Sequence, residues 1–199
     1  MAKAILHIHG KGGNAREAEH YKKLCHGYDV FGLDYKGDTP WDSKQEFIAA
    51  ADELAKRYEH ITIIANSIGA YFAMNALAGK KIEKALFISP IVNMEKLITD
   101  MMQWAHVSEQ ELCEKREIPT DFGETLSWEY LQYVRSNLLK WTVPTEILYA
   151  EKDNLTSLET VTAFAREHGA GLTVMENGEH WFHTEEQMAF LDEWIKRVL

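Results

Sequence analysis

A serine at a strand-to-helix turn is the first group in this sequence that could do covalent chemistry. Residues 65–70 read Ala-Asn-Ser-Ile-Gly-Ala, directly after an apolar run at 61–65, and they open a stretch rich in small residues. A nucleophilic Ser67 would need this layout, because a sharp turn exposes the hydroxyl group and the helix N-terminus favours developing negative charge. A serine here could also simply cap the helix. Alanine at position 65, where the G-x-S-x-G pattern has glycine, is a departure from that pattern.

A serine hydroxyl group becomes a useful nucleophile only when a base removes its proton and an acid orients that base. Both partners follow later in the chain. Asp153 comes just after an apolar run at 146–150, and His180 comes just after a run at 172–175. We expect Ser67 to act as the nucleophile, His180 as the general base and Asp153 as the acid that orients it.

Other side chains compete for the two supporting roles. Glu151 and Glu176 are alternative acids, and Asp153 also fits a plain turn residue. His183 is close enough in sequence to replace His180, but it directly precedes the expected cap of the last helix. We therefore favour His180.

The turn after the first apolar run offers donors for an oxyanion. Residues 7–14 read His-Ile-His-Gly-Lys-Gly-Gly-Asn, and such a turn can aim a backbone N–H group at the serine's pocket. We expect the backbone N–H groups of Lys11 and Ile68 to form the oxyanion hole. Each donor of this kind stabilises a transition state by about 3 kcal/mol.

The elements that must position these groups follow an alternating pattern. Short apolar runs alternate with longer amphipathic stretches, which is typical of parallel strands covered on both faces by crossover helices. We therefore expect an α/β protein, a three-layer α/β/α sandwich around a mostly parallel six-stranded sheet. The expected strands are 4–9, 29–33, 61–65, 85–89, 146–150 and 172–175. Parallel strands would bring Ser67, Asp153 and His180 to one edge of the sheet.

One connection is too long for a simple crossover. About 50 residues separate the fourth and fifth strands, whereas about a dozen suffice. We expect a single domain over residues 1–199 with a helical insertion at about 94–140. Its methionine and aromatic side chains indicate two or three helices that either pack into the core or form a lid over the active site.

Composition limits the partners and the compartment. The chain has 199 residues and a net charge of −10, from 31 acidic and 21 basic residues, which opposes binding to nucleic acid or to anionic membranes. The residues before His9 are too few and too polar for a signal peptide, and the two cysteines lack metal-ligand spacing. We expect a cytoplasmic protein with no metal and no cofactor. A homodimer stays open, because an apolar stripe can face either a core or a second subunit.

Taken together, the histidine-glycine turn at residues 9–10, the turn at Ser67, Asp153 and His180 resemble the α/β-hydrolase superfamily, over nearly the whole chain. The resemblance implies strand order 4-3-5-6-7-8 in that family's numbering, without its first two strands, and a lid where the insertion lies. It also implies a hydrolase, by default a serine esterase acting on a small-molecule acyl substrate. Relatives with the same three residues also cut thioesters, amides, lactones and carbon–carbon bonds.

Two alternatives belong to other classes. The segment 10–15 also fits the G-x-G-x-x-A pattern of a dinucleotide-binding oxidoreductase, with Asp34 ending the next strand. That interpretation leaves the order of Ser67, Asp153 and His180 unexplained. The second alternative is a non-catalytic member of the same fold that binds a ligand or partner, since a fold does not fix a function.

Overall fold

The computed structural model describes residues 2–199. The chain divides into two compact units. The larger comprises the residues up to Val92 together with Lys140–Leu199, and the smaller comprises Asn93–Leu139. Each unit is described by itself below.

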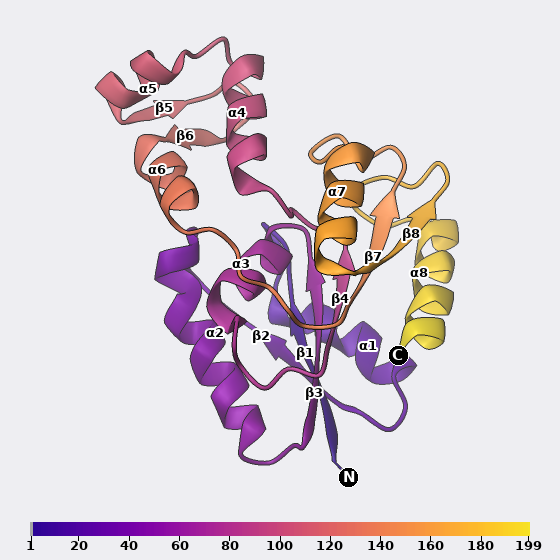
Figure 1. Ribbon diagram of the computed structural model, residues 1–199. Coiled ribbons are helices and arrows are strands. Elements are labelled where there is room, and N and C mark those ends of the chain that lie inside the picture. The colour runs from indigo at the N-terminus through magenta and orange to yellow at the C-terminus, as the bar shows by residue number, and fades with distance from the viewer. Residues whose placement is uncertain (1) are drawn as a thin grey trace. The chain divides into compact units, whose positions relative to one another are not determined.

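A six-stranded, wholly parallel sheet forms the centre of the larger unit (Figure 1). Its order is β2-β1-β3-β4-β7-β8, which is the order the family resemblance implied. The strands are β1 (Lys3–Ile8), β2 (Asp29–Leu33), β3 (His60–Asn66), β4 (Lys84–Ile88), β7 (Thr145–Ala150) and β8 (Gly171–Met175). All six expected strands are confirmed to within two residues at either end.

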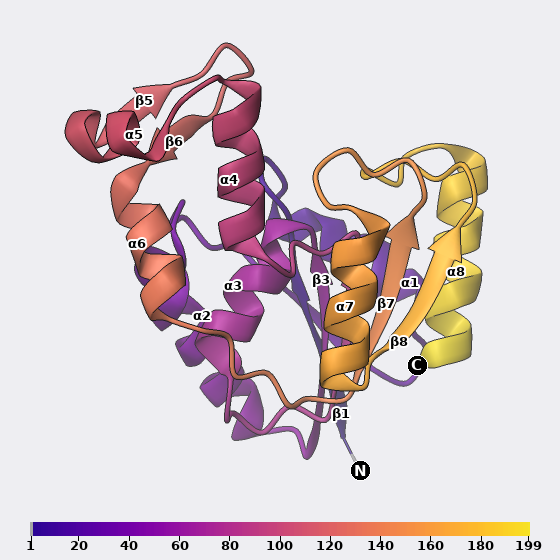
Figure 2. The same cartoon turned by 45° about the horizontal axis from the view of Figure 1, so that its top comes forward.

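Helices cover both faces of this sheet, which confirms the three-layer sandwich (Figures 1 and 2). On one face, α1 (Ala18–Leu24) and α8 (Glu185–Val198) bury Tyr21, Leu191 and Trp194 in one core cluster with residues of β1, β3, β4 and β7. The other face carries α2 (Pro40–Ala55), α3 (Ile68–Leu77) and α7 (Leu158–His168). A short 3-10 helix, η1 (Ala15–Glu17), precedes α1.

The last helix begins as its sequence indicates. Thr184 caps α8 and pairs with Gln187 in a capping box, where each side chain binds the other residue's backbone N–H group. This start fixes the end of the loop that carries His180.

The smaller unit is not purely helical, so the expectation of helices alone needs correction. It contains α4 (Met94–Trp104), α5 (Glu109–Lys115) and α6 (Trp128–Ser136), but also a hairpin of β5 (Glu117–Pro119) and β6 (Thr125–Ser127). Gly123, at a φ of 84°, allows the turn between those strands. Three-residue strands are too short for an alternating pattern to reveal. That this unit acts as a lid stays a prediction.

One arginine joins the three helices of the smaller unit. Arg135 of α6 donates to Glu95 of α4 at 2.7 Å and to both carboxylate oxygens of Glu109 of α5, at 2.6 and 3.0 Å. These charge-assisted hydrogen bonds hold the helices together within the unit.

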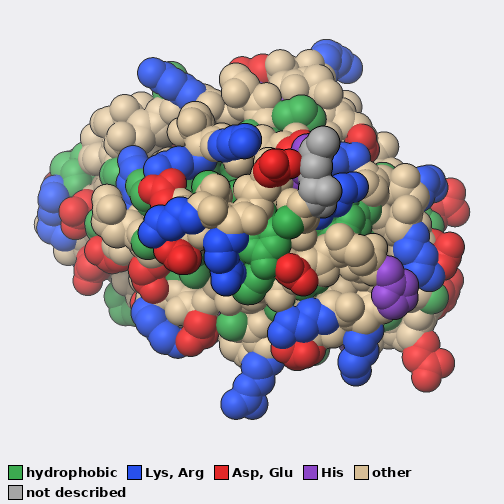
Figure 3. All heavy atoms as spheres, turned by 90° about the horizontal axis from the view of Figure 1, so that it is seen from below, with side chains coloured by type: hydrophobic (Ala, Val, Ile, Leu, Met, Phe, Trp, Pro, Cys, Tyr) green, Lys and Arg blue, Asp and Glu red, His purple; other side chains and the backbone are tan. Residues whose placement is uncertain are grey.

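The amino ends of the strands of the six-stranded sheet form a polar surface. A hollow of about 380 Å³ there is lined by residues that include Lys3, Glu83, Lys84 and Glu146. Figure 3 views the molecule from this end, with basic and acidic side chains interspersed. In the part of the chain that the structure describes, none of the helices combines the length and the apolar character needed to cross a bilayer.

Candidate active site

Ser67 occupies a strained turn between β3 and α3. Its backbone has φ 50° and ψ −122°, in a region that non-glycine residues rarely adopt. The turn is held by its neighbours: the Ser67 N–H donates to the Ile88 carbonyl at 3.0 Å, and the Ser67 carbonyl accepts from Ile91 N–H at 3.1 Å. The Ser67 side chain makes no capping hydrogen bond to α3. Ser67 thus occupies the N-cap position of α3 without capping the helix through its hydroxyl group.

The structure brings the three candidate residues together in one hydrogen-bonded chain. Ser67 Oγ lies 2.8 Å from His180 Nε2, although the residues are 113 positions apart, and His180 Nδ1 lies 2.7 Å from Asp153 Oδ2. A carboxylate only accepts hydrogen bonds, so Nδ1 carries the proton of the neutral imidazole. Nε2 then accepts from the serine hydroxyl group. This is the arrangement in which a histidine can act as a base towards a serine.

Asp153 is held more tightly than its place in a turn suggested. Its side chain is fully buried. Its second oxygen, Oδ1, accepts backbone N–H groups from Leu155 at 2.8 Å and Thr156 at 3.1 Å. The carboxylate thus has three donors, and one of them is His180.

The competing side chains lie elsewhere in the two loops. Glu151 accepts the backbone N–H of Asn177 at 2.8 Å, and Glu176 is exposed. His183 Nδ1 donates to the Trp181 carbonyl at 2.7 Å. Among the hydrogen bonds and ion pairs of residues 2–199, none joins either glutamate to His180, and none joins His183 to Ser67.

The turn after β1 packs directly against the turn that carries Ser67. A Cβ atom on Gly69 would lie 2.4 Å from the His9 carbonyl oxygen, and one on Gly10 would lie 3.2 Å from the Cβ of Ser67. Only glycine therefore permits this approach at position 69. Ile68 is the first residue of α3, so its N–H group has no acceptor within the helix. Lys11 follows Gly10 in the turn that packs against Ser67, and its role and that of Ile68 as oxyanion donors stay predictions.

An aromatic pair supports the same turn. The His9 ring stacks on Tyr35 with centroids 4.3 Å apart, and the Tyr35 hydroxyl group donates to the His9 carbonyl at 3.0 Å. His9 Nδ1 donates to the Gly10 carbonyl at 2.8 Å, which fixes the ring. The contribution of Tyr35 could not be read from the sequence, because it lies 26 positions from His9.

The glycine-rich turn does not have the surroundings of a dinucleotide site. Asn14 and Glu17 form a capping box, so side chains of the protein satisfy the N–H groups at the start of η1. A dinucleotide-binding fold also has strand order 3-2-1-4-5-6, which differs from the order found here. Within residues 2–199, no group of three histidine, cysteine or acidic side chains is placed to hold a metal ion.

Comparison with known proteins supports the fold. No protein-family model matches the sequence, and no curated protein matches it. Among solved structures, Est1E from Butyrivibrio proteoclasticus is similar with a TM-score of 0.77 at 18% identity, over 98% of this chain and 86% of Est1E. Mouse alpha/beta hydrolase domain-containing protein 10 is similar with a TM-score of 0.75 at 14% identity, over 98% and 88% of the two chains. A putative hydrolase from Agrobacterium vitis has a TM-score of 0.77 at 15% identity, over 98% and 87%. Together with the strand order and the turn at Ser67, these similarities show that the chain has the α/β-hydrolase fold.

Proposed function

We propose that this protein is a serine hydrolase that cleaves a carboxylic ester of a small molecule through an acyl-enzyme on Ser67. One observation carries the proposal: the continuous hydrogen bonds from Ser67 Oγ to His180 and from His180 to the buried Asp153. Thioesters and amides react by the same chemistry and belong to the same proposal.

The reaction has two steps. In the first, Ser67 Oγ attacks the substrate carbonyl carbon while His180 Nε2 takes the hydroxyl proton, and the buried Asp153 stabilises the resulting imidazolium. The carbonyl oxygen becomes an oxyanion, bound by the backbone N–H groups of Lys11 and Ile68. His180 then gives the proton to the leaving alcohol. In the second step, water attacks the acyl-enzyme with His180 again as base, and Ser67 is regenerated.

The surroundings of Ser67 suit this role in two further ways. The strained backbone lifts the hydroxyl group out of the sheet, and such strain concentrates at functional sites. The turn also places developing negative charge at the N-terminus of the ten-residue helix α3, where the helix dipole favours it.

Esters of small apolar or aromatic acids are the first substrates to test. Two similar solved structures are described as esterases, one from Pyrococcus furiosus and one from Rhodothermus marinus. Est1E has been solved with bound ferulic acid, an aromatic acid. A cytoplasmic location and a homodimer remain predictions from the sequence.

The proposal is tested by active-site labelling combined with turnover. The protein is treated with a small fluorophosphonate, its intact mass is measured, and the labelled peptide is mapped. Hydrolysis of p-nitrophenyl acetate and butyrate is followed in parallel. We expect one adduct, on Ser67, and a Ser67→Ala variant that folds but loses about 10⁴-fold or more in kcat. A well-folded protein that takes no adduct, or a Ser67→Ala variant with near-parental turnover, would contradict the proposal.

A pair of histidine variants tests the assignment of the base. His180→Ala should lose activity to about the same extent as Ser67→Ala, because the two groups act as a unit. His183→Ala should keep most of its activity, because its ring contacts the Trp181 carbonyl rather than Ser67. The opposite result would assign the base to His183.

A further inference from the structure

Tyr149 is a buried tyrosine next to the proposed site. It is the penultimate residue of β7 and only 2% of its surface is exposed. Its hydroxyl group donates to the Thr156 carbonyl at 2.8 Å. Burial first, and then the negative charge of Asp153, raise the pKa of Tyr149. The hydroxyl group therefore keeps its proton and remains a donor at neutral pH.

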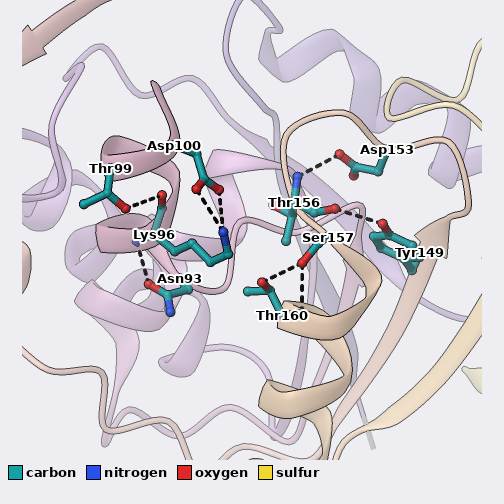
Figure 4. Close-up of polar contacts among 9 residues, drawn as sticks. All are labelled: Asn93, Lys96, Thr99, Asp100, Tyr149, Asp153, Thr156, Ser157 and Thr160. Atoms are coloured by element: carbon teal, nitrogen blue, oxygen red, sulfur yellow. Dashed lines mark hydrogen bonds and ion pairs between the residues drawn. The ribbon is translucent and has the colours of Figure 1, made fainter. Parts of the chain in front are cut away.

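The residue that accepts this hydrogen bond also donates to Asp153. The backbone N–H of Thr156 lies 3.1 Å from Asp153 Oδ1, and Figure 4 shows the two contacts side by side, from Tyr149 to Thr156 and from Thr156 to Asp153. The other oxygen of Asp153 accepts from His180. The chain of contacts thus runs from Tyr149 through one peptide segment to the carboxylate and on to the imidazole.

The segment between Asp153 and α7 has fixed points at both ends. At its start, the Asp153 N–H donates to the Ala150 carbonyl at 3.0 Å. At its end, Ser157 caps α7 by accepting the Thr160 N–H at 3.2 Å. Between these points the Tyr149 hydroxyl group is the side-chain donor to the segment's backbone. Its hydrogen bond to the Thr156 carbonyl adds to the two backbone N–H groups of the segment, Leu155 and Thr156, that Asp153 Oδ1 accepts.

We propose that Tyr149 is a positioning residue for the reaction, which fixes the Asp153 carboxylate through Thr156 so that its second oxygen faces His180. This inference rests on the proposed function. Without the hydroxyl group, the Thr156 carbonyl loses its donor inside the protein, where a polar group must find another partner. The segment then shifts, Asp153 Oδ1 loses one of its two backbone donors, and the carboxylate rotates more freely beside His180.

Tyr149→Phe tests this inference, because it removes one oxygen atom and leaves the ring. We expect kcat for p-nitrophenyl acetate to fall about tenfold, as for the loss of one well-aligned hydrogen bond. KM should not change, because the lost hydrogen bond is made to the Thr156 carbonyl, behind Asp153, and not to the substrate. The pH–rate profile should also change, because the Asp153 carboxylate is hydrogen-bonded to the His180 imidazole. Tyr21→Phe is the matched control, since Tyr21 is a residue of α1 that is 4% exposed and packs in the core. It should change stability without changing kcat or the pH profile.

A second measurement does not depend on turnover. The Nδ1 proton that His180 shares with Asp153 should give a low-field proton resonance, which His180→Ala would abolish. In Tyr149→Phe this resonance should shift or broaden, and in Tyr21→Phe it should not. A Tyr149→Phe variant with parental kcat, pH profile and resonance would overturn the inference. An unmodified protein that neither turns over esters nor takes the fluorophosphonate would instead overturn the proposed function.

Discussion

Replacing Gly69 by alanine tests whether the packing between the Ser67 turn and the turn after β1 sets the reaction rate. The added Cβ atom would lie 2.4 Å from the His9 carbonyl oxygen and 2.9 Å from a side-chain carbon of Ile8. Ordinary contact begins at 3.4 Å. The His9 carbonyl group belongs to the backbone of the turn after β1 and cannot rotate aside as a flexible side chain could, so the two turns must separate by about 1 Å.

In the proposed mechanism, a separation of this size would move the Lys11 N–H group away from the oxyanion. Misplacement by about 1 Å costs on the order of 100-fold in rate, which corresponds to about 2.7 kcal/mol of transition-state stabilisation. We therefore expect kcat/KM of Gly69→Ala for p-nitrophenyl acetate to fall about 100-fold. The rate of fluorophosphonate labelling should fall as well, because an oxygen atom of the reagent also gains negative charge in the transition state of that reaction, as the carbonyl oxygen of the ester does.

Two controls separate geometry from stability. A Cβ atom on Gly10 would lie 3.2 Å from the Cβ of Ser67, so Gly10→Ala requires a shift of only a few tenths of an ångström and should cost less than about tenfold. Ala73→Gly lowers the stability of the same helix by about 1 kcal/mol, without approaching the turn. Parental kcat/KM in Gly69→Ala, or a larger loss in Gly10→Ala than in Gly69→Ala, would refute the reasoning.

Two further predictions concern stability. Ser67→Gly should abolish labelling as Ser67→Ala does. In urea unfolding, Ser67→Gly should be more stable than Ser67→Ala by about 1 kcal/mol, because glycine relieves the strain at a φ of 50°. A glycine variant less stable than the alanine variant would contradict the strain argument. Burial is the main cause that lowers the pKa of His7 to about 3, from the 6.5 of an exposed histidine. As the pH falls, His7 therefore takes up a proton in the unfolded chain before it does so in the folded protein. The folded protein loses stability between pH 6.5 and pH 3 for this reason. Between pH 7 and pH 5, the free energy of unfolding of His7→Phe should therefore fall by about 2 kcal/mol less than that of the parent. An identical pH dependence of unfolding in the two proteins would show that His7 is not the cause.

The sheet could be predicted because its signal is local. Each strand is a short apolar run, and strands buried on both faces need no partner to be recognised. The hairpin of β5 and β6 gave no such signal, because three residues per strand cannot establish an alternating pattern. Its formation depends on Gly123 and on pairing within the smaller unit, as in the contact of Glu117 with Ser127.

The sequence by itself determined which chemical groups are available and at which edge of the sheet they lie. Ser67, Asp153 and His180 each follow an apolar strand, and in a parallel sheet all three positions must fall at the carboxyl edge. The choice between Asp153 and Glu151 depended on the tertiary structure, which sets Glu151 on the Asn177 N–H and Asp153 on His180.

Tertiary structure also decided what holds the Asp153 carboxylate in place. The link from Tyr149 through Thr156 to Asp153 depends on the path of one loop and on side-chain rotamers. The contact between Ser67 and His180 joins residues 113 positions apart. Periodicity and spacing describe neighbours along the chain, whereas these hydrogen bonds require loop directions that only the packed fold sets.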